Sequence, residues 1–575
     1  MLLLNNSKSI AWLFCSIFLV TASVHAEESK NEANQEVLDA WQEVSGQSGE
    51  ISEENDGTIE WHGQATQDIY HVDVESSQPG NTLSGLDEGN FSTTRLQGDL
   101  RYNEVSGAVN YIQGGVSLSN DEALQSLYRS QVTNIQFGRV ANDYQLAAGD
   151  VVADFSKIGS SLGLRGLYAS KQKNAFTVAG YAGTVATSWE SLFNRSTITG
   201  QPARNQYLRD VIGTKVSYAV DQNWSVFGTG QTFSDRESSL DDALSAFTFS
   251  ESGVTGTAGV SYQDEKASFS VELGTSRVSY DAEGADDASD TAVIVDAAYA
   301  WQQVNVQAGY HHLGTRYTSL SQNVLSGVRE GFVSGQWFIT PNLTYGGDVR
   351  HADSRISNIF DQKSPLSSLY SLTNWLTYSV SSLPGLSVSV QDTRNWGNIK
   401  GVDAKNQNSR TELSTSYANQ HYSASIALSN QKEKNRASSL SNSTTDGVQV
   451  SLGRQILTGE LLMMPTVSGN AQLYGGYQQQ RIANGTETTT GNQGVAMNMG
   501  SKNIGQWQVS LTNQDTSQPN GAPTLNTKSI YFDWTKVIAE VFSIKAYLSN
   551  NYINHGDSTK RVDEKTFGLQ GDYQW

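Results

Sequence analysis

The sequence contains a single cysteine, Cys15, among 575 residues. Cys15 lies inside an apolar run near the N-terminus that has the character of an export signal, so we expect the mature chain to contain no cysteine. Bulky Phe14 precedes it, whereas a lipoprotein signal carries a small residue there, so lipid attachment is not expected. This scarcity excludes disulfides, cysteine-ligated metals and c-type haem attachment.

Long apolar runs and proline are also scarce. No window after residue 26 approaches about 18 apolar residues, which is the length that a transmembrane helix needs. Proline occurs only 8 times, and the texture of the chain is uniform from about Ile59 to the end. We therefore expect neither a helical membrane protein nor several soluble domains joined by proline-rich linkers.

Basic residues are outnumbered, since 38 lysines and arginines face 58 aspartates and glutamates, for a net charge of −20. Contacts to nucleic acid need clustered basic side chains, so a nucleic-acid partner is not expected. The phosphate-binding pattern G-x-x-x-x-G-K-S/T and a convincing G-x-G-x-x-G are both missing, so nothing in the sequence supports a nucleotide cofactor.

The N-terminal residues have the pattern of a secretory signal peptide. Lys8 supplies a positive charge, Ile10–Val20 is apolar, and the segment Val24-His25-Ala26 ends in a small residue, so we predict cleavage after Ala26. This divides the chain into a signal peptide (1–26), an acidic N-terminal segment (27–58) and a repetitive remainder (59–575).

The acidic segment 27–58 differs from everything that follows it. It has many carboxylates against one lysine, and its apolar residues recur at helical spacing: Val37, Leu38, Trp41 and Val44. This spacing predicts a short amphipathic helix over 31–44. Two interpretations stay open: a plug or docking segment for a periplasmic partner, or a disordered acidic tail.

Alternation of apolar and polar residues dominates 59–575. In the segment 91–103 one face carries Leu96, Gly98, Leu100 and Tyr102, and the other carries Arg95, Gln97, Asp99 and Arg101. The same alternation recurs in 254–262, 267–273, 293–301 and 386–391. Membrane strands need about 9–11 residues that alternate between a lipid face and a lumen face, and these segments match that pattern.

Short turns and long loops punctuate these strands. The predicted short turns are Asn103-Glu104, Asn142-Asp143, Gln172-Lys173, Asp221-Gln222, Glu265, Gln302-Gln303, Pro341, Pro384-Gly385, Asn419-Gln420, Gly459-Glu460, Asn503 and Ala539-Glu540. Longer loops lie between them, and tyrosines and tryptophans cluster near the turns, as in an interfacial girdle. We therefore predict an all-β fold: a single closed antiparallel transmembrane β-barrel of about 26 strands (about 24–26), with short turns on the periplasmic side.

The last strand ends in an alternating aromatic pattern: Phe567, Leu569, Gly571, Tyr573 and Trp575. This resembles the C-terminal β-signal of Gram-negative outer-membrane proteins. The resemblance implies a location in the bacterial cell outer membrane, surrounded by lipid and lipopolysaccharide, and insertion by the barrel-assembly machinery.

Candidate functional residues are charges that the alternation places on the lumen face. They are Arg95, Asp99, Arg101, Lys215, Glu272, Asp348, Arg350 and Arg454. Both signs occur, which predicts a wet lumen without an ion preference, and most of these charges are expected only to solvate a wide wall.

Catalytic and metal sites find little support. The stretch 159–163 matches G-x-S-x-G but lacks the predicted helix that a nucleophile elbow needs. His311-His312 lacks the spacing of a helical zinc site, and the acidic stretch 281–290 does not have the order of a calcium-binding EF-hand. We therefore expect no catalytic residue, no metal and no cofactor.

The predicted width carries the functional inference. Barrels of about 16–18 strands leave an aqueous channel, so about 26 strands would enclose a hole too leaky to stay open. We expect a wide gated conduit or assembly platform that exports a secreted protein or a polysaccharide, with a periplasmic or lumen-filling protein partner. The alternatives are a diffusion porin for small solutes and, less favoured, a barrel enzyme.

Two stretches, Ala148-Gly149-Asp150 and Leu164-Arg165-Gly166-Leu167, resemble part of a fimbrial usher. We do not expect the plug and the additional domains of that family in this chain.

Overall fold

The structure is a computed structural model, and it describes residues 57–77, 88–121, 128–193, 206–240, 248–321, 326–401, 404–435, 438–461, 464, 466–517, 524–554, 556 and 561–575. The chain divides into Met1–Asp56 and Gly57–Trp575, and only the second unit is described. The predicted signal peptide, the predicted helix over 31–44 and nearly all of the acidic segment lie outside the described residues.

The described residues form 26 strands. They are β1 (Thr58–Ser76), β2 (Gly89–Asn103), β3 (Val109–Ser119), β4 (Ser130–Val140), β5 (Tyr144–Asp154), β6 (Ser161–Lys173), β7 (Phe176–Val185), β8 (Arg209–Ala219), β9 (Trp224–Asp235), β10 (Glu251–Gln263), β11 (Ala267–Tyr280), β12 (Ala288–Ala300), β13 (Val304–Leu313), β14 (Val328–Thr340), β15 (Leu343–Ser354), β16 (Ser367–Ser379), β17 (Leu386–Ile399), β18 (Ala404–Ala418), β19 (Tyr422–Asn435), β20 (Ser443–Ile456), β21 (Ser468–Ile482), β22 (Glu487–Ser501), β23 (Gly505–Thr516), β24 (Leu525–Ala539), β25 (Phe542–Asn554) and β26 (Arg561–Gln574).

Three short helical turns accompany the strands in the described part of the chain: α3 (Trp189–Leu192), η2 (Glu237–Ser239) and η3 (Ser439–Ser441). Among the residues that the structure describes, no helix is long and apolar enough to cross a membrane.

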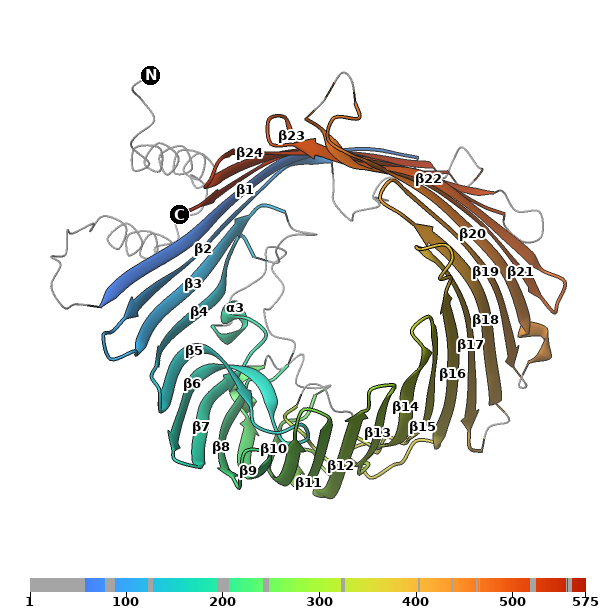
Figure 1. Cartoon of the computed structure of the whole chain (residues 1–575). Helices are drawn as coiled ribbons and strands as arrows, with labels where there is room; N and C mark the ends of the chain where they lie inside the picture. The colour runs from blue at the N-terminus through green and yellow to red at the C-terminus, as the bar shows by residue number, and fades with distance from the viewer. Residues whose placement is uncertain are drawn as a thin grey trace, which may run out of the picture. The chain divides into compact units, whose positions relative to one another are not determined.

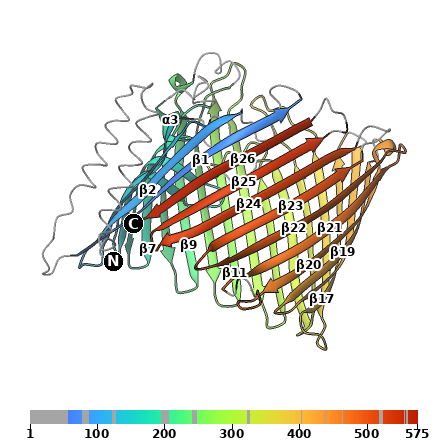
Figure 2. The ribbon, with the colours of Figure 1, turned by 90° about the horizontal axis from the view of Figure 1, so that it is seen from above.

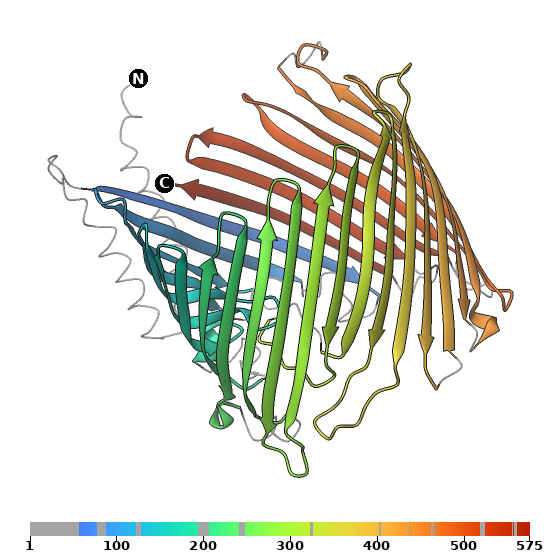
Figure 3. The same ribbon diagram turned by 60° about the horizontal axis from the view of Figure 1, so that its bottom comes forward.

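Each strand pairs antiparallel with the next along the chain, and β26 returns to pair with β1 (Figure 1). This last pairing runs from Gln64 opposite Gln574 to Ser76 opposite Val562. At its end the Gly63 amide donates to the Trp575 carbonyl over 3.0 Å, and the Trp575 amide donates back over 3.1 Å. The predicted closed antiparallel barrel is confirmed, and so is the predicted number of 26 strands. Figures 2 and 3 show the strands side by side and inclined to the axis of the barrel.

The predicted short turns all fall where an even-numbered strand leads into the next odd-numbered one. The turn placed at Gln172-Lys173 lies slightly later, because β6 continues through Lys173 and Asn174 takes the left-handed conformation with φ 54°. Asparagine tolerates this conformation better than most residues do. The connection at Gly459-Glu460 is longer than a tight turn and spans 457–467.

The two faces of the barrel wall differ in chemistry. Large apolar side chains are exposed along one face, for example Trp61 of β1, Leu100 of β2 and Leu273 of β11. Register sets them on a common face, since Trp61 lies opposite Leu100. Aromatic side chains gather at the short-turn end of this face: Trp224 and Tyr262 lie 4.9 Å apart. A band of exposed apolar side chains edged by aromatic residues is the outer surface of a membrane barrel.

The barrel has two regions that differ in what covers their inner face. We call strands β5–β13 the lobe, because buried apolar side chains pack inside it, including Phe155, Leu164, Tyr181, Val211, Phe233 and Val278. We call strands β16–β24 the open wall, because nearly all of their described side chains are at least partly exposed. Figure 1 shows α3 and neighbouring connections on the inner side of the ring, on the side of the lobe.

Candidate functional site

The segment Phe155–Ser160, which joins β5 to β6, folds onto the inner face of the lobe. We call it the latch. The Ser156 hydroxyl donates to the Glu272 carboxylate of β11, and the Lys157 amide donates to the same carboxylate over 3.1 Å. Within the latch the Gly159 amide donates to the Ser156 hydroxyl over 2.7 Å. Since Glu272 is buried, these contacts supply the hydrogen bonds that a buried carboxylate requires.

A second inward connection, Gly314–Ser321, fastens the latch from the other side. The Tyr317 hydroxyl donates to the Ile158 carbonyl over 3.0 Å, and the Leu320 amide donates to the Gly159 carbonyl over 2.9 Å. Ile158 and Tyr317 are almost fully buried and pack together with Ile294 of β12. Two loops far apart in the sequence thus close the lobe around an apolar core.

The latch also reaches an ion pair on β12. The Lys157 ammonium lies 2.7 Å from a carboxylate oxygen of Asp296, and the other oxygen lies 2.8 Å from Nε2 of His311. These ionic contacts attach the latch to the barrel wall. The latch in turn keeps the interior of the lobe packed.

The open wall presents a different inner face. Its strand residues opposite the apolar side are mainly hydroxyl and amide side chains, such as Ser389, Gln391, Asn408, Ser425, Gln449, Ser451, Gln472, Asn492, Gln508 and Thr527. Several pair across strands: the hydroxyls of Ser389 and Ser414 lie 2.6 Å apart, and those of Ser425 and Ser451 lie 2.7 Å apart.

Charges are sparse on this inner face of the open wall. Among its described strand residues they are Arg410, Glu412, Glu433 and Asp533. Arg410 donates to its neighbour Glu412 over 2.7 Å, so part of this charge is internally neutralised. The open wall therefore offers a broad surface of uncharged hydrogen-bond donors and acceptors.

The predicted lumen charges on β2 and β8 lie on the polar face. Arg95, Asp99 and Arg101 are on the side of β2 opposite Leu96 and Leu100. Arg101 donates to Asp99 over 2.9 Å. On β8, the Lys215 ammonium lies over the ring of Phe227 at 5.0 Å.

The predicted charges on β11 and β15 also lie on the polar face. Glu272 is covered by the latch. On β15, Arg350 bonds Glu330 over 3.0 Å, and Asp348 lies two residues before it on the same face. The charges of β2, β8, β11 and β15 thus form separate pairs and caps, and the structure does not gather them into one site.

Arg454 was predicted with these charges, but the register of β20 places it on the apolar side. It shares a face with Val450 and Leu452 and lies opposite Tyr422. Its guanidinium sits over the Tyr422 ring at 5.9 Å and 3.9 Å from Glu460 at the end of the strand. A long basic side chain at the edge of an apolar band extends toward the polar boundary in this way. The signal for this in the sequence is its spacing, since Arg454 follows Val450 and Leu452 at intervals of two residues.

The remaining motif candidates are separated by the structure. Ser161 of the G-x-S-x-G stretch begins β6 directly after the latch, with no helix following it. His311 lies on the inner face beside Asp296, and His312, its neighbour in β13, points to the opposite face. No three histidine, cysteine, aspartate or glutamate side chains come together as metal ligands within the described part of the chain.

The two usher-like stretches are brought together in one register. Ala148 of β5 lies opposite Leu167 of β6, and Asp150 lies opposite Arg165. Arg165 and Asp150 form an ion pair of 3.0 Å. These residues adjoin the latch, which the sequence analysis did not foresee. The signal that could have found it is the pair of apolar residues Phe155 and Ile158 in a connection between two strands.

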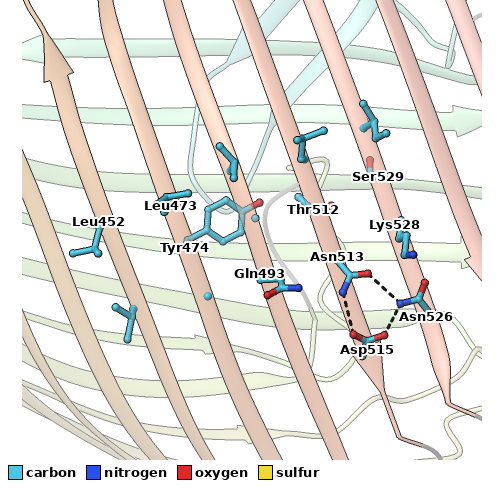
Figure 4. Close-up of a pocket in the computed structure, with 16 residues that line it drawn as sticks. Leu452, Leu473, Tyr474, Gln493, Thr512, Asn513, Asp515, Asn526, Lys528 and Ser529 are labelled. Carbon is cyan, nitrogen blue, oxygen red and sulfur yellow. Dashed lines mark hydrogen bonds between the residues drawn. The ribbon is translucent and has the colours of Figure 1, made fainter.

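Two hollows lie on the outer surface of the described strands. The first, of about 910 Å³, spans β20–β24 (Figure 4). Its apolar part includes Leu452, Leu473 and Ile530. Its polar part lies toward the long-loop end, where Asn513 and Asn526 donate to Asp515, the former over 3.0 Å. The second hollow, of about 530 Å³, lies over β4–β7 and is almost wholly apolar.

A closed sheet of antiparallel strands with an exposed apolar outer band and polar inner face is the architecture of outer-membrane proteins. The chain is a bacterial outer-membrane β-barrel. Its final strand pairs with β1, and Phe567 and Leu569 are exposed on the apolar face. Tyr573 stacks on Trp575 at 5.6 Å, at the closing edge of the barrel.

No protein-family model matches the sequence, and no curated protein matches it. Among solved structures, the translocation pore of the P pilus usher PapC is similar, with 9% identity over 90% of this chain and 99% of that one, and a TM-score of 0.36. The unliganded ferric citrate transporter FecA has 10% identity over 91% of this chain and 79% of that one, and a TM-score of 0.37. OccK3 of Pseudomonas aeruginosa has 12% identity over 65% of this chain and 96% of that one, and a TM-score of 0.32. This level of likeness concerns general architecture only.

Proposed function

We propose that the barrel is a wide conduit for a large, neutral, hydroxyl-rich polymer, that is, a polysaccharide. The observation that carries this proposal is the lining of the open wall. Hydroxyl and amide side chains exchange hydrogen bonds readily with sugar hydroxyls, and each such bond is weak in the presence of water. Many weak, equivalent sites let a polymer enter without being trapped, which is the condition for passage through a channel.

The lining favours a polysaccharide over a secreted protein as cargo. A protein carries both signs of charge, and a conduit for it gains nothing from a nearly uncharged wall. The open wall has only a few inner-face charges among its described strand residues, and Arg410 is already paired with Glu412. The lobe, by contrast, uses its ionic groups for internal packing, as Lys157 does with Asp296.

A release assay from vesicles tests the proposal. The full mature protein is reconstituted into phospholipid vesicles loaded with fluorescent neutral dextran, with an anionic dextran sulfate of equal size as the matched control. We expect the neutral dextran to be released faster. Retention of dextran, together with rapid release of small sugars, would overturn the proposal. It would favour the second candidate, a diffusion porin, which is equally compatible with the polar lining.

A lining variant sharpens this test. Ser425→Asp and Ser451→Asp place two carboxylates where a hydroxyl pair now lies at 2.7 Å. We expect them to change the relative release of neutral and anionic dextran, whereas Ser106→Asp in the turn between β2 and β3 leaves both unchanged. Equal behaviour of the two variants would count against passage along the open wall.

Two partners belong to the same proposal. The acidic segment 27–58 is proposed to dock a periplasmic partner or to plug the lumen, and Phe567, Leu569, Tyr573 and Trp575 are proposed to be recognised by the barrel-assembly machinery. Affinity capture from membranes, with and without residues 27–58, tests the first. Membrane insertion of Trp575→Ala, compared with Trp337→Ala, tests the second, and equal insertion of the two variants would contradict it.

A further inference from the structure

The seam between β4 and β5 is the least paired in the barrel. Only five residue pairs join these strands, from Gln136 opposite Gly149 to Val140 opposite Gln145. The other neighbouring strands share nine or more pairs, as β6 and β7 do. The paired part adjoins the short turn, so the strands separate in the half nearer the long loops. We call the facing edges 130–135 and 150–154 the seam.

Carboxylates take the place of the missing strand pairing. The Val132 amide of β4 donates to Oε1 of Glu190 over 2.7 Å, and the Ile135 amide donates to Oδ2 of Asp150 over 2.7 Å. A backbone amide that has lost its strand partner needs another acceptor where water does not reach it. The two carboxylates therefore cap an edge that β5 leaves open.

Glu190 belongs to α3, which is wedged against the seam from inside the barrel (Figure 1). Glu190 is only 1% exposed. The neighbouring Trp189 donates its indole N–H to Asp150 over 2.7 Å, and Arg165 forms an ion pair with the same carboxylate and also bonds the Ala186 carbonyl ahead of the helix. A helix of four residues is not stable alone, so α3 depends on these contacts.

Gly149 marks the point where β5 leaves β4. Its φ is +99°, a conformation that favours glycine. A Cβ there would lie 2.2 Å from the Ile135 carbonyl oxygen. The separation of the strands is therefore built into the backbone at this position.

The apolar hollow of about 530 Å³ lies on the outer wall at the base of the seam. Phe137, Leu146 and Leu167 line it, and small residues such as Ala148 and Gly180 form its floor. Phe137 and Ala148 are themselves a pair, directly next to the pair Gln136 and Gly149 at which the seam begins. An apolar hollow within the membrane band accepts an alkyl chain and excludes a sugar or a peptide.

We propose that the seam is a lateral gate that passes an alkyl chain between the barrel interior and the membrane, with α3 as its removable plug and the apolar hollow as its outer binding site. Opening breaks the bonds that Glu190 and Asp150 make to β4. Charge-assisted bonds of this kind hold the gate closed at rest. A cargo with a fatty-acyl or lipid tail is the occupant that this geometry fits.

The first experiment measures the width of the seam. Because Cys15 is the only native cysteine, spin labels can be placed at Thr133→Cys and Val152→Cys, which are exposed on either side of the seam. We expect one short distance in the native protein and an added longer component when Glu190→Ala and Asp150→Ala are introduced.

Labels at Leu452→Cys and Leu473→Cys, which lie opposite each other across fully paired β20 and β21, are the control. Their distance should not change. An unchanged distance across the β4–β5 seam in the double variant would overturn the gate.

The second experiment locates the alkyl chain. The full protein in phospholipid vesicles is exposed to palmitate carrying a photoreactive diazirine, and labelled residues are mapped by mass spectrometry. We expect labelling at the hollow and at Trp189 of α3, and its loss in Ala148→Trp. Ala424→Trp, on the outer face of β19, should leave labelling unchanged.

The hollow over β20–β24 is the control that distinguishes passage through the gate from ordinary contact with membrane lipid. Its wall is fully paired, so palmitate there should label outer residues such as Leu473 and no inner residue. Labelling confined to outward residues at both hollows would contradict the gate. Neither experiment depends on dextran passage, so the gate and the proposed conduit can fail separately.

Discussion

The lobe and the open wall are made of the same alternating strands, yet the inner face of the lobe is covered and the inner face of the open wall is exposed. Their connections make the difference. In the lobe, the latch and the segment Gly314–Ser321 place Phe155 and Tyr317 in the interior, where they are buried. On the open wall, β17 and β18 are joined by only 400–403, and β21 and β22 by only 483–486. The described residues of these two connections, Lys400, Gly401 and 483–486, include no large apolar side chain that could pack onto the inner face.

Alternation therefore decides which side chains face inward, and the apolar residues of the connections decide whether that face meets water. The exposed inner face of the open wall carries hydroxyl and amide groups. The covered inner face of the lobe carries apolar groups and hydrogen-bonded charges such as Glu272. Three substitutions test this contrast, in order of expected effect, and a fourth tests a short turn outside both regions.

An inward lysine should distinguish the two regions most sharply. Val278 of the lobe is fully buried, so Val278→Lys places an uncompensated charge in the apolar cluster and should cost about 3–5 kcal/mol of folding free energy. Ser425→Lys on the open wall should leave stability nearly unchanged and shift the channel toward anion selectivity. Urea unfolding in vesicles and bilayer reversal potentials measure the two effects. Similar stability of both variants would contradict the division.

Removal of a large side chain should have a comparable effect. Phe155→Ala leaves a cavity between Tyr168 and Tyr181, whose rings lie 6.3 and 5.0 Å away, and should destabilise the barrel by about 3–5 kcal/mol. Tyr474→Ala, on the half-exposed inner face of the open wall, is the matched control and should cost far less. Equal shifts of the urea midpoint would show that the lobe is not a packed core.

The backbone at the edge of the lobe should show a smaller effect. Gly149→Ala forces an alanine to φ +99° against the Ile135 carbonyl, at a cost of about 1–3 kcal/mol. Gly491→Ala on the open wall meets no atom within 4 Å and should be neutral. Thermal unfolding followed by gel mobility compares them, and a neutral Gly149→Ala would contradict the strained seam.

The dependence of folding stability on acidic pH should show the smallest effect. Glu104, in the turn between β2 and β3, accepts hydrogen bonds from Arg139 of β4, from Asn110 over 2.8 Å and from Ser106 over 2.9 Å. These bonds lower the pKa of Glu104 to about 2 from its ordinary 4.5, the bond from Arg139 contributing most. Because the folded-state pKa is the lower one, the stabilisation is complete above pH 4.5 and is lost as the pH falls toward 2.

Glu104→Gln should therefore flatten the dependence of stability on pH in this window. Glu265→Gln, in another short turn, is the control. Arg139 also donates to the Tyr144 hydroxyl of β5, so this contact stabilises the paired ends of β4 and β5 next to their short turn. Unfolding midpoints measured at several acidic pH values check the effect, and a native-like slope in Glu104→Gln would exclude it.

Most of the fold was predictable because strands and turns are local. The alternation around Leu96 and Leu100 and the turns at Pro341 and Pro384-Gly385 are readable from a few neighbouring residues. Closure and strand number follow from counting such turns.

The latch, the seam and the uncharged lining were not predicted. Contact between Ser156 and Glu272 depends on the curvature of seven strands, and the loss of pairing beyond Gly149 depends on register. Neither leaves a local periodic signal. The lining of the open wall, by contrast, is a local feature, since its hydroxyl and amide side chains alternate with apolar ones along each strand.

The central claim, that a neutral open wall carries a sugar polymer past a filled lobe, is tested most directly by single-channel recording. The full protein is placed in a planar bilayer, and a dextran of several kilodaltons or polyethylene glycol of equal size is added. We expect a large conductance that dextran blocks for longer than polyethylene glycol, with dwell times shortened by Gln449→Leu and Ser451→Ala and unchanged by Phe155→Ala. A channel that shows no difference between the two polymers, or a dextran dwell time that depends on Phe155 and not on the open wall, would contradict the account.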